Sequence, residues 1–385
     1  MLNIHHLRHP LISARNACAL VGLHAGALRT GMDGWLRYQK DRRFRRNLVV
    51  DGFRNRNELG KCDQKLLTRI CRSYEAASSI SSAKPYGPTS WWMELRRCSL
   101  HPVLTALQTE DLFALERIYS NFFRDRCSDG LVGKSILLNS RVPYLVLMAH
   151  QWAYLSEALL RLDRWKALTR DLHRYEDLLA PAIGNPFGIE LDGVLICSGA
   201  EHQHYGAQRI GRLVDEAGGR VADIGGGYGA MAYYLLRDYP RITYWSFDLP
   251  ETLALAAYYL IQSFPEKRVW LFGEERGDDP TLATFDIVLM PISELATAES
   301  RSADLVFSSH AMSDLDPAAL GVYLNRVLCI TKRYFLWQGM SSAAGTLRHL
   351  IHEKYSELSL EQATQYHLHG KDRSKYLQSE LLYKL

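Results

Sequence analysis

The stretch Asp223-Ile224-Gly225-Gly226-Gly227-Tyr228-Gly229 decides the fold of this chain. It follows the short apolar run Arg220-Val221-Ala222, which is typical of a strand, and it precedes an amphipathic run over 230–237, which is typical of a helix. Glycine at every second position removes the Cβ atoms that would keep a backbone turn away from a ligand. The following helix adds unpaired N–H groups and the positive end of its dipole. The stretch therefore predicts a strand, a ligand-binding loop and a helix.

The spacing within this loop bears on the cofactor. Gly225, Gly227 and Ala230 fit the G-x-G-x-x-G/A fingerprint of dinucleotide-binding folds only loosely. That fingerprint accounts neither for Asp223, two residues before the first glycine, nor for Gly229. An acidic residue followed by G-x-G-x-G is the form found in S-adenosylmethionine (SAM) methyltransferases, where the loop faces the methionine and ribose of the cofactor. The pattern favours SAM and leaves an NAD(P)-dependent oxidoreductase as the alternative.

A second acidic residue, Asp248, ends the next expected strand, over 242–247. A carboxylate at this place can accept both ribose hydroxyls, because it lies beside the glycine loop at the carboxyl edge of a parallel sheet. The alternative is an Asp that caps the helix beginning at Pro250. NAD enzymes also bind the ribose with an acidic residue at this place. Asp248 therefore indicates an adenosine-type ligand but does not distinguish SAM from NAD.

The catalytic candidate is His310, which follows the strand expected over 303–309 and so lies at the same edge of the sheet. Methyl transfer from a sulfonium to an alcohol is an in-line displacement, and a neutral hydroxyl is a poor nucleophile. An imidazole that titrates near pH 7 can remove the proton as the bond forms. We expect His310 to be this general base, the alternative being a loop histidine that only packs or caps locally. Asp314 and Asp316 are expected mainly as caps.

The pattern beyond residue 184 predicts a doubly wound α/β sheet, Rossmann-like and preceded by a mainly helical region. Expected strands are 219–224, 242–247, 284–290, 303–309 and 333–338, with a short extra strand at 269–272 and an antiparallel last strand at 376–383. Expected helices are 229–238, 250–264, 316–331 and 343–358. We divide the chain into a basic N-terminal extension of undetermined order (1–80), a helical substrate-binding or dimerisation region (81–183) and a methyltransferase domain (184–385).

Composition narrows the class of protein. The chain has 385 residues, a formal net charge of +4 and 7 Cys, and none of the cysteines has C-x-x-C spacing. This favours reduced thiols and a cytoplasmic protein over a zinc site or a disulfide framework. The small charge and the lack of an N/D-P-P-Y/W signature disfavour nucleic acid. The arginines of 42–56 are expected as a solvated face, the alternative being an electrostatic footprint for an acidic partner. No run approaches the roughly 18 apolar residues of a membrane span, and no His/Asp cluster has metal-ligand spacing.

Three segments, 221–236, 247–260 and 304–315, resemble the bacterial sugar O-methyltransferase family, within the class I SAM-dependent methyltransferases. The likeness covers about residues 85–385 and includes 184–188 and 381–384. Asp248-Leu249-Pro250 and the segment after His310 are also similar to plant phenolic O-methyltransferases. By this resemblance the SAM-binding Asp falls on Asp248 and the catalytic His on His310, with Met290-Pro291 near the adenine and Ser308 near the cofactor. Ala311-Met312 departs from the Asp-Trp pair of the plant enzymes.

These observations predict a SAM-dependent O-methyltransferase that acts on a hydroxyl of a sugar, glycan or other small metabolite, and a homodimer is the expected assembly. A phenolic acceptor, an oxidoreductase and a non-catalytic SAM-fold binder are the alternatives. The expected catalytic residue is His310, and no metal ligand is expected. The expected cofactor-binding residues are Asp223, Gly225, Gly227, Tyr228, Gly229, Asp248, Leu249, Met290, Pro291 and Ser308.

The helical half is expected to contact the acceptor. Its aromatic residues can stack on a ring or serve as core, and four polar residues before the first main strand are candidates for the pocket mouth. The aromatic candidates are Trp91, Trp92, Tyr144, Trp152 and Tyr154, and the mouth candidates are His202, His204, Tyr205 and Arg209.

Overall fold

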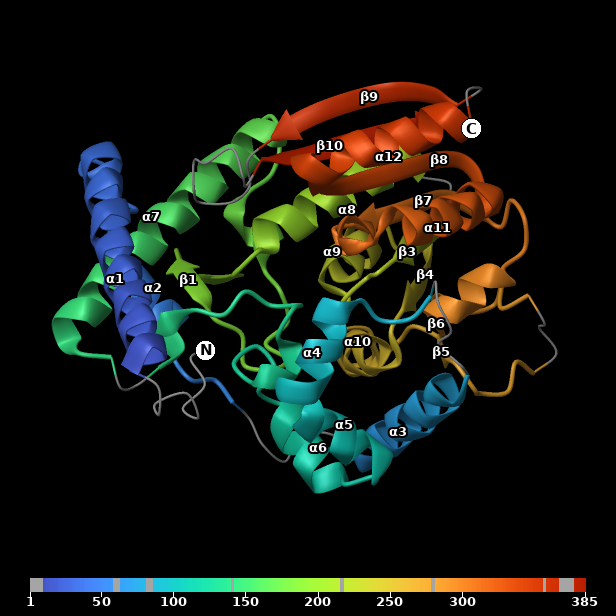
Figure 1. The fold of residues 1–385 in the computed structure, drawn as a ribbon, viewed down its shortest axis with the longest axis horizontal. Helices are drawn as coiled ribbons and strands as arrows, with labels where there is room; N and C mark the ends of the chain where they lie inside the picture. The colour runs from blue at the N-terminus through green and yellow to red at the C-terminus, as the bar shows by residue number, and fades with distance from the viewer. Residues whose placement is uncertain are drawn as a thin grey trace.

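The computed structural model describes residues 10–57, 63–80, 86–139, 142–214, 218–277, 281–355, 358–366 and 377–385. Within these ranges, one sheet of eight strands in the order β5-β6-β4-β3-β7-β8-β10-β9 forms the centre (Figure 1). β4, β5 and β6 lie on one side of β3, and the later strands β7 to β10 lie on its other side. The carboxyl ends of β3, β4 and β7 therefore meet where the strand order switches from one side of β3 to the other. This is the place at which ligands bind in open α/β sheets.

The parallel strands are close to those expected from the sequence. Their bounds are β3 Arg220–Ile224, β4 Thr243–Asp248, β5 Val269–Leu271, β6 Ile287–Pro291, β7 Ala303–Ser309 and β8 Thr331–Met340. The expected last strand is confirmed as β10 (Gln378–Lys384), antiparallel to β8, although its expected first residue, Tyr376, lies outside the described residues. The sequence did not predict β9 (Ser359–Tyr366), which pairs antiparallel with β10.

Helices cover both faces of the sheet, which explains the apolar runs of its strands. Along β7, Leu305 and Phe307 join the core beneath one set of helices, and Val306 joins the core on the opposite face. The first set is α8 Ala200–Val214, α9 Ala230–Asp238 and α10 Pro250–Ser263, and the second is α11 Pro317–Ile330 and α12 Ser341–Lys354. The doubly wound α/β fold is thus confirmed, and α12 ends before the expected 358.

Helices also fill most of the N-terminal half, as expected for residues 81–183, and they include the described parts of 1–80, whose order the sequence left undetermined. They are α1 Pro10–Tyr38, α2 Asn47–Gly52, α3 Gln64–Ser79, α4 Ser90–Cys98, α5 His101–Gln108, α6 Leu112–Tyr119 and α7 Tyr144–Leu168. α1 lies along α7, and α3 packs on α10 (Figure 1). Gly34 of α1 allows the close approach of α1 to α7, because a Cβ at this position would lie 1.7 Å from Ser156 Oγ. The short hairpin of β1 Gly188–Leu191 and β2 Val194–Cys197 leads into α8.

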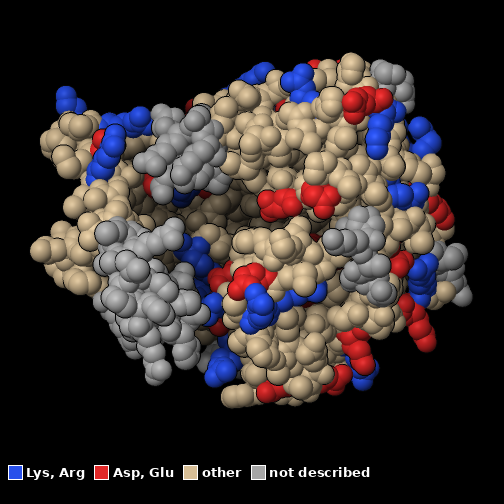
Figure 2. All heavy atoms as spheres, in the orientation of Figure 1, with Lys and Arg blue, Asp and Glu red and all other residues tan. Residues whose placement is uncertain are grey.

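The arginines of 42–56 form the expected solvated face only in part, because Arg42, Arg45 and Arg54 are exposed and the other three are half-buried. Arg43 binds Asp163 at 2.9 Å and donates to Tyr175 Oη at 2.7 Å, so it ties the segment after α1 to α7. Arg56 pairs with Glu190 of β1 at 2.6 Å. Basic and acidic side chains are interspersed over the face shown in Figure 2. The structure therefore uses several of these arginines to hold its own elements together.

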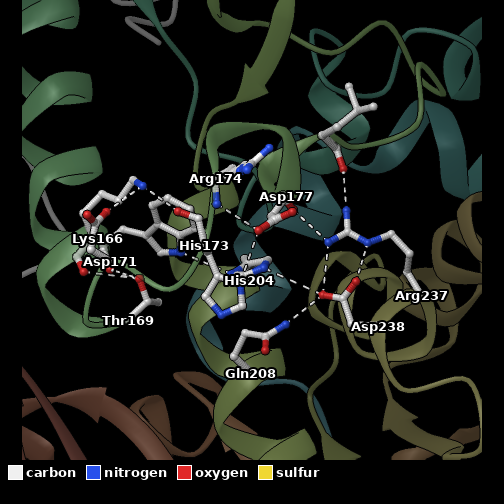
Figure 3. A network of polar contacts seen from close by, with 12 residues as sticks. Lys166, Thr169, Asp171, His173, Arg174, Asp177, His204, Gln208, Arg237 and Asp238 are labelled. Atoms are coloured by element: carbon white, nitrogen blue, oxygen red, sulfur yellow. Dashed lines mark hydrogen bonds and ion pairs between the residues drawn. The ribbon is translucent and has the colours of Figure 1, made fainter.

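A buried polar network holds α7 against α8, α9 and the short helix η4 (Tyr175–Leu178) (Figure 3). Trp165 Nε1 donates to His204 Nδ1 at 3.2 Å, and Gln208 Nε2 donates to Asp238 Oδ2 at 2.7 Å. His204 is 0% exposed, and burial lowers the pKa of its imidazole to about 3. The expectation that His204 lies at the pocket mouth is therefore wrong, because its neutral ring is part of the packing between helices.

Candidate active site

A cavity of about 620 Å³ opens at the carboxyl ends of the central strands, within the range of roughly 300–1,000 Å³ that is usual for small-molecule sites. Its floor is the glycine loop between β3 and α9. Its walls come from α4, from the segment 130–133, from the start of α8 and from the segment after β7. The face drawn in Figure 2 is visibly hollowed. The cavity brings together Asp223, Gly225, Gly227, Tyr228, Asp248, Leu249 and His310 from the residues expected at the site.

The glycine loop has a backbone that other residues rarely adopt. Gly225, Gly227 and Gly229 have φ of 79°, 60° and 89°. A Cβ on Gly225 would lie 2.2 Å from Ala311 Cβ, and its N–H donates to Phe247 O at 2.8 Å. Because of these constraints, the loop presents its backbone, without side chains at the glycines, as the floor of the cavity.

Asp223 is a buried carboxylate with one unsatisfied oxygen. Its side chain is 2% exposed, its Oδ2 accepts a hydrogen bond from Tyr244 Oη at 2.8 Å, and its Oδ1 has no partner in the structure. Burial, with a smaller contribution from Asp248, raises the pKa of Asp223 to about 7. A buried acceptor without a donor costs free energy, so a ligand that brings N–H or cationic groups would satisfy it.

Asp248 is oriented by the backbone around it. Its Oδ2 accepts from the N–H of Gly227 at 2.9 Å, and its Oδ1 accepts from the N–H of Leu249 at 2.7 Å. Burial raises the pKa of Asp248 to about 7, although these two hydrogen bonds oppose the rise. Leu249 occupies the N-cap position of α10, which has no side-chain cap, so Asp248 does not serve as the helix cap that the sequence offered as an alternative. Its carboxylate instead holds the glycine loop beside the cavity.

His310 follows the last residue of β7 in a conformation that is strained for a residue with a side chain, with φ 65° and ψ −34°. Its backbone N–H donates to Gln338 O at 2.8 Å. In its ring, Nδ1 lies 3.0 Å from Ser309 Oγ and Nε2 lies 3.0 Å from Gln378 Nε2. The imidazole lines the cavity together with Asp314, a carboxyl whose pKa burial raises. Asp316 caps α11 through the N–H of Ala319, as expected.

The other expected cofactor residues are not among those that line the cavity. Ser308 is fully buried and donates to Ile224 O at 3.0 Å, and Met290 is a core residue of the sheet. Gly229 is the N-cap of α9, where a Cβ would lie 2.8 Å from Leu260. Pro291 ends β6, and the next residue, Ile292, reaches the cavity.

Several residues of the cavity carried no signal in the sequence. Gln378 begins β10, and it meets His310 only because β10 inserts antiparallel beside β8. Arg161 of α7 and Glu201 of α8 also line the cavity, and their side chains are 3.4 Å apart. Glu201 is 2% exposed, and its Oε2 has no partner in the structure. These contacts join segments far apart in the chain, so no local motif records them.

Two of the five aromatic candidates line the cavity, and both belong to α4. Trp91 is 50% exposed there, and Trp92 donates through Nε1 to Glu251 Oε1 at 2.6 Å. Arg96 binds the same carboxylate through two nitrogens, at 2.6 and 2.8 Å, so α4 is fastened to α10. The remaining candidates lie elsewhere: Trp152 packs on Phe44, Tyr154 packs on Phe53, and Tyr144 is 63% exposed at the start of α7.

Of the four residues expected at the pocket mouth, one lines the cavity and three do not. His202 lines the cavity, and its Nε2 lies 3.2 Å from Ser309 Oγ. Tyr205 is buried against Tyr366, and Arg209 pairs with Glu380 of β10 at 2.9 Å. Among the described residues, no three His, Cys, Asp or Glu side chains are placed to hold a metal ion. No helix in the described ranges has the length and apolar character needed to cross a bilayer.

Comparison with known proteins places this geometry in an enzyme class. Residues 207–290 match the model of an O-methyltransferase domain, and this segment includes the glycine loop and Asp248. No curated protein matches the chain.

Three solved structures share part of the fold. Magnesium protoporphyrin IX methyltransferase ChlM of Synechocystis PCC 6803 has 13% identity and a TM-score of 0.35, over 48% of this chain and 79% of that one. N-methyltransferase NodS of Bradyrhizobium japonicum WM9 has 11% identity and a TM-score of 0.35, over 57% and 97%. The pyocyanin biosynthetic protein PhzM has 15% identity and a TM-score of 0.33, over 48% and 56%.

The domain match and the doubly wound sheet agree with the sequence-based expectation. The oxidoreductase alternative finds no support in the matched segment. Residues 207–290 therefore match an O-methyltransferase domain, and the protein is a methyltransferase.

Proposed function

We propose that this protein transfers the methyl group of SAM to a hydroxyl of a sugar or another polyhydroxylated metabolite, with His310 as the general base. The observation that carries the proposal is a cavity lined by two carboxylates, the buried Asp223 and the half-buried Asp248, and by the imidazole of His310. The carboxylates lie at the ends of the neighbouring strands β3 and β4, and His310 lies just beyond β7 on the other side of β3.

The residues present fit the cofactor. Asp248 would receive the ribose hydroxyls, and the unpartnered Oδ1 of Asp223 would receive a hydrogen-bond donor from the cofactor. Gly225 and Gly227 leave room along the loop, with Leu249 and Tyr228 beside it. Met290, Pro291, Ser308 and Gly229 would support this wall from behind. When bound, SAM supplies an electrophilic methyl group on a sulfonium.

His310 is prepared to accept a proton at Nε2. The amide N–H of Gln378 points at this nitrogen over 3.0 Å, and a nitrogen that accepts a hydrogen bond carries no hydrogen of its own. An acceptor hydroxyl that takes the place of the amide would meet an unprotonated nitrogen. Its proton would move to Nε2 as the oxygen gains the methyl group.

Glu201 and Arg161 support a polar, hydroxyl-rich acceptor. The unpartnered Oε2 of Glu201 can accept a hydroxyl hydrogen, and Arg161 can donate to a sugar oxygen. Trp91 presents a half-exposed aromatic face, which suits the C–H side of a sugar ring. A phenolic acceptor could use the same tryptophan but would leave Glu201 without a donor, so we rank it second. We propose that 81–183 supplies the acceptor wall and 184–385 the methyl-donor site.

The test is a mass measurement. The purified protein is incubated with SAM and, separately, with nucleotide sugars, glycosides and phenols, and each mixture is searched for a gain of one methylene. Methylation of sugars and not of phenols supports the proposal. Methylation of phenols alone contradicts the acceptor assignment, and binding of NADH in place of SAM contradicts the proposed chemistry.

We also propose a homodimer formed through α1. Four large apolar side chains are exposed along one side of this helix, away from the residues that face α7; they are Val21, Leu28, Met32 and Trp35. A second copy is a symmetric way to cover such a stripe. Light scattering should give twice the chain mass, and Leu28→Glu should give the single mass. A monomeric parent protein at micromolar concentration contradicts this assembly.

A further inference from the structure

The hydroxyl of Ser309 lies between two imidazoles from distant parts of the chain. Ser309 Oγ is 3.0 Å from His310 Nδ1 and 3.2 Å from His202 Nε2. The two rings are edge to face, with centroids 5.4 Å apart, although 107 residues separate His202 from Ser309. All three residues line the cavity. His202 belongs to α8 and Ser309 ends β7, so the sheet itself brings them together.

The hydrogen atoms along this line have one consistent order. Gln378 can only donate from its amide nitrogen, so Nε2 of His310 accepts, and the neutral ring carries its hydrogen on Nδ1. Nδ1–H then donates to Ser309 Oγ. The hydroxyl hydrogen of Ser309 is left to donate to Nε2 of His202, which in turn carries its own hydrogen on Nδ1.

We infer that Ser309 and His202 form a proton relay behind His310; this inference rests on the proposed role of His310 as base. When Nε2 of His310 takes the proton of the acceptor hydroxyl, the ring becomes an imidazolium. Its Nδ1–H bond then breaks toward Ser309 Oγ, and the Ser309 O–H bond breaks toward Nε2 of His202. His310 returns to the neutral state and His202 holds the positive charge. Only His310 touches the reacting hydroxyl, so Ser309 and His202 are positioning residues.

The relay gives His310 a fixed tautomer, because the ring can present Nε2 to the acceptor only while Nδ1 holds the hydrogen.

The first test needs no substrate. Nitrogen NMR of the histidine rings in the whole protein should show His310 and His202 both as Nδ1–H tautomers, with Gln variants of each used for assignment. Ser309→Ala should shift His310 toward a mixture of tautomers, and Ser309→Thr, which keeps the hydroxyl, should restore the parent spectrum. An Nε2–H tautomer at His310 in the parent protein overturns the relay.

The second test is kinetic. Ser309→Ala and His202→Gln should each lower kcat by about tenfold, a share of the roughly 10²–10⁴-fold that a general base contributes, while KM stays near the parent value. In mixtures of H₂O and D₂O, the rate should depend on the deuterium fraction along a curve in the parent protein and along a straight line in the two variants. The reason is that fewer protons move in the step. His349→Gln, at an exposed histidine paired with Glu353, is the matched control.

The outcomes separate the two proposals. A large loss in His310→Gln with no loss in Ser309→Ala or His202→Gln overturns the relay and leaves His310 as the base. Normal turnover in His310→Gln overturns the base and the relay together.

Discussion

The phenol of Tyr244 donates to Oδ2 of Asp223 over 2.8 Å and leaves Oδ1 of the same carboxylate without a partner. The two residues lie on the paired strands β4 and β3, so the sheet fixes this contact. A folded protein tolerates such a buried acceptor at a cost in stability, and a ligand that supplies a donor removes the cost. Stability and cofactor binding should therefore be linked through Asp223.

This linkage predicts a pH dependence of stability. Burial raises the pKa of Asp223 to about 7 from 3.8. A raised carboxyl pKa means that the folded state holds the proton more tightly than the unfolded state, so its stabilising contribution is full below about pH 4 and is lost as the pH rises to about 7. The loss would be on the order of 4 kcal/mol. Thermal unfolding without SAM, measured from pH 4 to pH 8, should show this decline, reduced in Asp223→Asn.

The same variant should separate stability from binding. Asp223→Asn should weaken SAM binding by roughly 10- to 150-fold, the range expected when a charged hydrogen bond is lost. Isothermal titration checks this value. Affinity equal to that of the parent protein would show that Asp223 has no contact with the cofactor.

Gly225 should tolerate no side chain. Gly225→Ala adds a Cβ 2.2 Å from Ala311 Cβ at a φ of 79°, so we expect a loss of stability of about 2–5 kcal/mol. Gly193→Ala is the matched control, because Gly193 has a φ of 82° with no atom near the added Cβ, and it should cost only about 1–2 kcal/mol. Equal losses in urea unfolding of the two variants would contradict the assigned clash.

The wall formed by α4 depends on Glu251. This carboxylate is 7% exposed and receives hydrogen bonds from Trp92 and Arg96. Glu251→Ala leaves both donors without their partner, so unfolding should become easier by about 3 kcal/mol. Glu94→Gln breaks an exposed pair on the same helix and should leave the melting temperature unchanged. A Glu251→Ala protein as stable as the parent would show that α4 does not depend on this anchor.

Trp91 should contribute to binding of the acceptor and not to binding of SAM. Its side chain is half-exposed in the cavity, so Trp91→Ala should raise KM for the acceptor by roughly 3- to 10-fold with little change in SAM affinity. Phe113→Ala, at an exposed aromatic residue of α6, is the control. An unchanged KM would remove Trp91 from the acceptor site.

The sequence predicted the sheet and the placement of the glycine loop beside the two carboxylates well, because both are encoded in local patterns. A strand, a glycine loop with Asp223 and an acidic strand end at Asp248 each occupy a few adjacent residues. Contacts between distant segments left no such pattern. Gln378 reaches His310 through the antiparallel insertion of β10, and Glu201 reaches Arg161 through helix packing. His204 looked like its neighbour His202, and only the helical turn between them decides that one faces the cavity and the other the core.

The most direct test of the account is the turnover of His310→Gln with SAM and a sugar acceptor identified by mass, measured alongside SAM affinity. We expect affinity close to the parent value and a turnover lowered by about 10²–10⁴-fold, because the loop and both carboxylates remain while the base is lost. Turnover near the parent value would contradict the account, since the methyl transfer would then proceed without this imidazole.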